Sequence, residues 1–138
     1  MERKTLVIDT NVFLEFLLLQ ERKDECVKLM QAVERGSLEA YVTGFSLHSI
    51  EVLLHRYRKT TALEQFLQRV IAAQGLMVYQ TSPAEELHIA TLSKGLPLDF
   101  DDALQYYVTQ TLEAVLVSFD KDFDRTDISR IEPSALLV

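Results

Sequence analysis

The sequence predicts an α/β protein in which a parallel sheet of about five strands is covered by helices on both faces, a three-layer α/β/α arrangement. Strand-like and helix-like segments alternate along the chain. The strand-like segments are also unbroken apolar runs, which is typical of parallel strands that are buried on both sides. With 138 residues the chain is long enough for one compact core, so we predict a single domain over residues 1–138.

The first part of the chain predicts a strand and two helices. The β-branched run KTLVI at 4–8 predicts the first strand, and the apolar segment at 11–19 that follows it predicts a helix. Residues 22–35 place apolar side chains at helical spacing, and Gly36 gives this second helix a natural end.

The middle of the chain repeats this pattern. LEAYVT at 38–43 predicts a second strand. Ser46 can cap a third helix over 46–59, because the apolar residues of this segment form one stripe at helical spacing. A fourth helix is expected over 61–74, before a glycine.

The last part of the chain predicts three more strands and two helices. LMVYQ at 76–80 predicts the third strand, and a proline then opens a fifth helix over 83–94. A sixth helix is expected over 101–112 and leads into an apolar strand at 113–119. SRIEP at 129–133 predicts a short final strand.

The negative charge of the chain is concentrated in one window. The net charge is −7, and residues 99–127 account for −6 of it, with eight acids against two bases. A net negative charge argues against a nucleic-acid partner when it is spread over the surface, but here it is local. Carboxylates this dense repel one another unless protons or cations compensate them, so the window is a candidate for divalent metal binding.

Cysteine content and hydropathy indicate the cellular compartment in which the protein is expected. Cys26 is the only cysteine, so no internal disulfide can form, and no cluster of cysteine and histidine suggests a zinc site. The uninterrupted apolar run at 16–19 is far shorter than the roughly 20 residues that span a bilayer. We therefore expect a cytoplasmic protein with no membrane partner.

Three acids are predicted to meet at one edge of the sheet. Ligands of open parallel sheets bind beyond the carboxyl ends of the strands, and Asp9 and Asp120 each directly follow a predicted strand. The helix that starts at Asp102 advances roughly 16 Å, and the strand after it returns about the same distance. Asp102 and Asp120 are therefore expected to be neighbours.

Glu51 lies on the margin of an apolar stripe. On a helix it falls within about 40° of Leu47 and about 60° of Leu54. A carboxylate that half faces the core is costly without a cation or hydrogen-bond donors. It could be compensated by a functional cation or by pairing with His55 or Arg58 along its own helix.

Four motifs resemble those of one family. VIDTNVFLEF, SIEVLL, DDALQYY and LVSFDKDF occur in the order, and with the character, of the motifs of PIN-domain ribonucleases, which include the VapC-type toxins of toxin–antitoxin pairs. The resemblance extends from Leu6 to about Pro133. It implies a strand order of 3-2-1-4-5, which would place Asp9 and Asp120 on adjacent strands, and cleavage of RNA that depends on Mg²⁺ or Mn²⁺.

The resemblance also implies roles for individual acids. The catalytic and metal-binding positions of the family fall on Asp9, Glu51, Asp102 and Asp120. Three of them, Asp9, Asp102 and Asp120, would contact the metal directly. Glu51 would reach it through water or help to activate water. Hard oxygen ligands of this kind suit Mg²⁺ or Mn²⁺.

Further residues support these acids. Asn11 and Ser118 match positions that would orient the carboxylates. Asp122 matches an additional acidic position of the family, and Asp101 competes with Asp102 as the ligand. Asp99 is assigned to capping the sixth helix.

The basic segment HRYRK follows Glu51 along the chain. Its cations Arg56, Arg58 and Lys59 could steer RNA toward the acids, or they could simply favour the dipole at the end of their helix.

The resemblance implies a metal-dependent endoribonuclease that is the toxin of a toxin–antitoxin pair, with RNA as substrate, a small antitoxin as partner and a homodimer as assembly. One alternative is a catalytically silent PIN fold that binds RNA or protein. Another is a phosphohydrolase of the haloacid dehalogenase type. That class expects a second aspartate two residues after the first, where this chain has Asn11.

Overall fold

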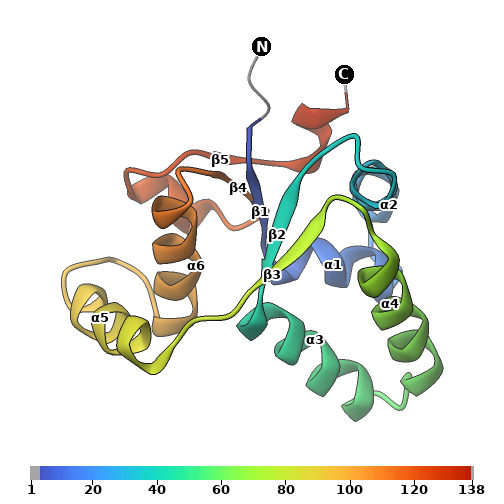
Figure 1. Ribbon diagram of the computed structural model, residues 1–138, viewed down its shortest axis with the longest axis horizontal. Helices are drawn as coiled ribbons and strands as arrows, with labels where there is room; N and C mark the ends of the chain where they lie inside the picture. The colour runs from blue at the N-terminus through green and yellow to red at the C-terminus, as the bar shows by residue number, and fades with distance from the viewer. Residues whose placement is uncertain (1–3, 138) are drawn as a thin grey trace.

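Five parallel strands form one sheet in the order β3-β2-β1-β4-β5 in the computed structural model, which describes residues 4–137 (Figure 1). The predicted class and strand order are confirmed. The ends of the predicted domain, residues 1–3 and 138, lie outside the described residues. The strands are β1 (Leu6–Ile8), β2 (Ala40–Thr43), β3 (Leu76–Tyr79), β4 (Val115–Val117) and β5 (Arg130–Ile131).

Within the described residues 4–137, six α-helices accompany the strands, each near its predicted place. Two short 3₁₀ helices, η1 (Lys121–Arg125) and η2 (Pro133–Leu136), were not predicted. Helices α1 to α4 lie on one side of the sheet, and α5 and α6 lie on the other (Figure 1). The α-helices are α1 (Thr10–Leu17), α2 (Lys23–Glu34), α3 (Gly44–Arg56), α4 (Thr60–Ala72), α5 (Pro83–Ser93) and α6 (Phe100–Thr111).

The two faces of the sheet bury separate hydrophobic cores. Along β1, Leu6 and Ile8 face the core beneath α1 to α4, whereas Val7 faces the core beneath α5 and α6. This alternation is the two-residue period of a strand, and because both faces are apolar it gives the unbroken runs seen in the sequence. Phe13 and Phe66 meet edge to face at 5.6 Å in the larger core.

The start of α3 differs from the prediction. Thr43, the last residue of β2, caps the helix by accepting a hydrogen bond from the Ser46 backbone N–H at 3.1 Å. Ser46 therefore lies inside the first turn, and its assignment as the cap was wrong. Both hydroxyl residues can cap a helix, and the end of β2 decides between them.

The helices of the described residues 4–137 are short, and none of them is long and apolar enough to cross a membrane. Cys26 is buried in the larger core, and burial raises the pKa of its thiol to about 12.

Candidate active site

Asp9 occupies the junction between β1 and α1 at the carboxyl edge of the sheet. It caps α1, and as a whole residue it is only 6% exposed. Its backbone N–H donates to the carbonyl of Val117 at 2.9 Å, which joins the ends of the adjacent strands β1 and β4. Asp120 follows β4 and caps η1, so both acids lie at the edge where the sequence placed them.

The carboxylate of Asp9 accepts hydrogen bonds on both oxygens. Oδ1 accepts from the Thr10 backbone N–H at 2.8 Å and from Gln105 Nε2 at 2.9 Å. Oδ2 accepts from the Ser118 hydroxyl at 2.7 Å and from Asn11 Nδ2 at 3.4 Å. Burial raises the pKa of Asp9, and the bonds from Ser118, Gln105 and Thr10 oppose that rise. The donors therefore hold the charged carboxylate in one orientation.

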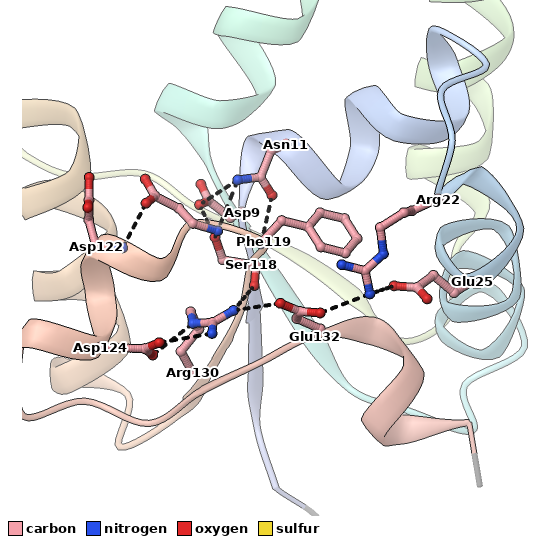
Figure 2. A network of polar contacts seen from close by, with 11 residues as sticks. Asp9, Asn11, Arg22, Glu25, Ser118, Phe119, Asp122, Asp124, Arg130 and Glu132 are labelled. Atoms are coloured by element: carbon pink, nitrogen blue, oxygen red, sulfur yellow. Dashed lines mark hydrogen bonds and ion pairs between the residues drawn. The ribbon is translucent and has the colours of Figure 1, made fainter.

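Asn11 and Ser118 lie where the prediction put them, beside Asp9 (Figure 2). The Ser118 hydroxyl accepts from the Asp120 backbone N–H at 3.0 Å while it donates to Asp9. The Asn11 side chain donates to Ser118 Oγ at 3.3 Å and accepts from the Phe119 N–H at 3.3 Å. Two short side chains thus connect the turn after β1 to the turn after β4.

Helix α6 adds two more carboxylates to this edge. Asp101 and Asp102 lie in its first turn, and Asp102 is half-buried. Burial raises the pKa of Asp102 to about 7, and the negative charges of Asp101, Asp120 and Asp9 contribute in that order. The acids are therefore close enough to disfavour one another's ionisation.

Four carboxylates line one open pocket of about 270 Å³. Among the described residues, no lysine or arginine lines the pocket, so no basic side chain there compensates the mutual repulsion of the carboxylates. The lining residues are Asp9, Thr10, Asn11, Leu14, Phe45, Ser49, Asp101, Asp102, Gln105 and Asp120.

This donor set fits a hard divalent cation. Oxygen ligands and uncompensated negative charge are what Mg²⁺ or Mn²⁺ selects. Within residues 4–137, however, no three His, Cys, Asp or Glu side chains are already arranged to hold one ion. Mg²⁺ usually keeps several waters and uses one or two carboxylates, and the pocket has room for such waters. Simultaneous direct contact of Asp9, Asp102 and Asp120 with one ion stays a prediction.

Glu51 is not brought together with the other acids. Its side chain is 35% exposed, and Oε1 lies 3.5 Å from Nδ1 of His48, one turn earlier on α3. Neither of the pairings weighed from the sequence, with His55 or Arg58, is the one formed. Glu51 does not line the acidic pocket, so a role at the metal requires a bridging water.

Two other acids of the window lie outside the pocket. The Asp122 backbone N–H donates to Asp120 Oδ1 at 2.9 Å. The exposed carboxylate of Asp122 lies 3.4 Å from the guanidinium of Arg125. Asp99 occupies the position before α6, yet its side chain makes no capping hydrogen bond. Asp99 is therefore at the predicted cap position, but the prediction that its side chain caps the helix was wrong.

The basic segment lies at the far end of α3. Arg56, Arg58 and Lys59 are exposed and do not line the pocket. Arg56 is twelve residues beyond Gly44, which corresponds to about 18 Å along the helix axis.

Gln105 is a site residue that the sequence did not reveal. The residue is 1% exposed, and its side chain donates to Asp9 and to Ser46 Oγ at 2.8 Å and accepts from Thr43 Oγ1 at 2.8 Å. The available signal was its place one turn after Asp102, where a polar residue interrupts an apolar helix face. The hydrogen-bond partners of Gln105 are distant in sequence, so these contacts could not be predicted from the sequence alone.

Arg130 was also missed. Its guanidinium donates to the Ser118 carbonyl at 2.9 Å and forms a two-pronged pair with Asp124 at 2.8 and 3.0 Å (Figure 2). It also contacts Glu132 at 3.1 Å, which pairs with Arg22 at 2.8 Å. This chain of charges fixes the end of β4, from which Ser118 and Asp120 reach the site.

A five-stranded parallel sheet in the order 3-2-1-4-5, with an acidic pocket at its carboxyl edge, defines a class of α/β protein whose site suits divalent cations. The chain belongs to the PIN domain family, which it matches over residues 6–129.

Solved structures share this fold. The chain is similar to VapC20 of Mycobacterium tuberculosis, described as a sarcin–ricin loop cleaving toxin, with a TM-score of 0.76, 16% identity, and coverage of 93% of this chain and 99% of the other. A toxin–antitoxin complex from Klebsiella pneumoniae gives a TM-score of 0.67 and 17% identity, with 93% and 97% coverage. VapBC2 of Rickettsia felis, bound to promoter DNA, gives a TM-score of 0.67 and 14% identity, with coverage of 93% of this chain and 98% of the other. No curated protein matches the sequence.

Proposed function

We propose that the protein is a divalent-metal-dependent endoribonuclease that hydrolyses phosphodiester bonds of RNA. The observation that carries the proposal is the pocket in which Asp9, Asp101, Asp102 and Asp120 converge from β1, α6 and β4. A phosphodiester is already anionic, so a pocket of uncompensated carboxylates cannot receive it unaided. A cation that offsets the acids also makes the pocket compatible with a phosphate.

Asp102 and Asp120 would hold the cation together with Asp9, and Glu51 would reach it through water. When bound, a Mg²⁺ or Mn²⁺ ion neutralises developing charge and makes water more acidic. The protein supplies orientation. Ser118, Gln105 and Asn11 fix the Asp9 carboxylate, and the Ser118 hydroxyl also fixes the backbone of Asp120. The acids are thereby held in position before the substrate binds.

The toxin assignment is supported by the structural neighbours. VapC20 is described as a toxin that cleaves the sarcin–ricin loop, and the Klebsiella neighbour as a toxin–antitoxin complex. The structural match with this chain covers nearly the whole length of each of these two neighbours. We propose the same biological setting here, with a small antitoxin as partner and a homodimer as the assembly.

The test is an RNA cleavage assay with the purified full chain. A panel of mixed RNAs is incubated with Mg²⁺, Mn²⁺ or EDTA, and the wild type is compared with Asp9→Asn and Asp102→Asn. Asp24→Asn is the matched control, because Asp24 is an exposed acid on α2, outside the pocket. We expect cleavage by the wild type and the control with either metal, and a loss of at least about 100-fold in both pocket variants.

Cleavage that survives EDTA or Asp102→Asn contradicts the proposed site. Metal-dependent RNA binding without cleavage by the wild type supports the silent PIN fold instead. The phosphohydrolase alternative lacks the aspartate that it expects two residues after the first, because Asn11 occupies that place and donates its amide to Asp9.

A further inference from the structure

The phenylalanines of the chain divide sharply by exposure. Of the seven, Phe13, Phe16, Phe66 and Phe123 are buried, and Phe119 is half-buried beneath the guanidinium of Arg22. The remaining two, Phe45 and Phe100, are 37% and 44% exposed.

Both exposed rings lie at the carboxyl edge of the sheet. Phe45 is in the first turn of α3, and Phe100 is the first residue of α6, directly before Asp101 and Asp102. Exposed phenyl rings are costly to solvate, and here they border the acids rather than a remote surface.

The two rings line the same hollow. Its volume is about 460 Å³, within the range of sites for small organic groups. Phe45 also lines the acidic pocket, so the two spaces share one wall. The residues that line the hollow are Gly44, Phe45, His48, Gln80, Thr81, Glu86, Phe100 and Leu104.

Polar groups surround the aromatic rings. The Thr81 hydroxyl donates to Glu86 Oε2 at 2.6 Å, which fixes that carboxylate at the hollow. The amide of Gln80 lies against Gly44, where a Cβ atom would come within 2.0 Å of Gln80 Oε1. The hollow thus combines flat apolar faces with an amide and a carboxylate that can bond to the edge of a heterocycle.

We propose that this hollow, next to the acidic pocket, binds a nucleobase adjacent to the cleaved phosphate by stacking it on Phe45 and Phe100. Single-stranded RNA is recognised in this way, with bases stacked on aromatic side chains and bonded along their edges. The inference rests on the proposed function, which brings RNA to the neighbouring pocket. The shared wall at Phe45 and the polar edge groups favour a base over an apolar protein segment.

The experiment measures RNA binding separately from cleavage. Binding of a fluorescein-labelled, mixed-sequence single-stranded RNA is followed by anisotropy at saturating Mg²⁺ in the full chain carrying Asp102→Asn, which we expect to prevent cleavage. Phe45→Leu and Phe100→Leu keep the apolar character but remove the ring, whereas Phe45→Tyr and Phe100→Tyr keep the ring. Ile71→Ala is the control, because it removes an exposed apolar side chain of α4 that does not line the hollow.

We expect each leucine variant to weaken binding about tenfold or more, from the typical energy of stacking one base. The tyrosine variants and Ile71→Ala should stay within about threefold of the parent. In the cleavage-competent chain, the leucine variants should raise KM more than they lower kcat. Far-ultraviolet circular dichroism verifies that every variant is folded.

Equal RNA affinity in the leucine and tyrosine variants overturns the inference. A change of elution volume on size exclusion with unchanged RNA affinity also overturns it, and assigns the rings to a contact between copies of the chain. If RNA binding depends on the rings but the wild type does not cleave RNA, the base-binding site stands and the proposed function is refuted. If the wild type cleaves RNA but binding does not depend on the rings, the proposed function stands and the base-binding site is refuted.

Discussion

Gln105 Nε2 donates a 2.9 Å hydrogen bond to Asp9 Oδ1, between residues that are 96 positions apart in sequence. The bond is buried and joins the middle of α6 to the end of β1. Because the same amide also contacts Ser46 and Thr43, four separate segments of the edge depend on one side chain. The geometry of the acidic pocket therefore follows from the packing of α6.

Replacing Gln105 with leucine should destabilise the protein. Leucine has a similar volume, but it leaves the oxygens of Asp9 and Thr43 without their buried partner, at a cost of about 1–3 kcal/mol. Urea denaturation measures the loss. Gln68→Leu, at an exposed position of α4, should change stability by less than about 0.5 kcal/mol. A Gln105→Leu protein as stable as the wild type would show that the amide does not hold the site together.

Asp102 should make the metal-free protein less stable as the pH rises. Its pKa in the folded protein is about 7, above the ordinary value of 3.8, so the folded state keeps this proton after the unfolded state has lost it. The stabilisation is complete below about pH 3.8 and is lost as the pH rises to about 7. Asp102→Asn removes this contribution.

The prediction is checked by denaturation in EDTA at several pH values between 4 and 8. The stability of Asp102→Asn relative to the wild type should increase over this window by about 1–2 kcal/mol, after allowance for solvent screening. Asp24→Asn controls for the loss of one acid at an exposed site. A constant difference between Asp102→Asn and the wild type would mean that Asp102 titrates normally.

Arg130 should contribute to stability far more than a surface arginine. Its side chain is 11% exposed and bonds to Ser118, Asp124 and Glu132. Arg130→Met therefore removes the partner of the buried Ser118 carbonyl and of Asp124, and leaves Glu132 paired with Arg22 alone. We expect a loss of about 1.5–3 kcal/mol in the free energy of unfolding.

The matched control is Arg125→Met, which breaks an exposed ion pair with Asp122. That change should cost less than about 1 kcal/mol. Arg130→Lys should fall between the two, because an ammonium keeps the charge but cannot make the two-pronged contact with Asp124. Equal losses of stability for Arg130→Met and Arg125→Met in urea denaturation would show that Arg130 does not hold the end of β4 in place.

The sheet and its edge acids could be predicted because both depend on local pattern. A buried parallel strand is an apolar run, and an acid that closely follows it must lie at the carboxyl edge. Asp9 directly follows β1, whereas Asp120 lies three residues beyond the end of β4, which is shorter than the strand predicted at 113–119. Asp102 followed from counting rises along α6 and β4. Neither prediction depends on which face of a helix packs against which neighbouring element.

The remaining site residues depend on packing between distant segments. Gln105 and Arg130 act through partners in other strands and helices, and no spacing in the sequence specifies them. The exposure of Glu51 depends on how α3 packs against its neighbours, and its carboxylate lies beside His48, one turn earlier on the same helix. The helical periodicity could place it only on the margin of a stripe.

The acidic pocket is proposed to bind the ion that RNA cleavage requires. The most direct measurement records Mn²⁺ binding by electron paramagnetic resonance and RNA cleavage by the same protein over one range of Mn²⁺ concentration. We predict that cleavage saturates with the binding curve, and that Asp102→Asn weakens binding at least tenfold while Asp24→Asn leaves it unchanged. Cleavage without Mn²⁺ binding, or binding that Asp102→Asn does not weaken, would contradict the account.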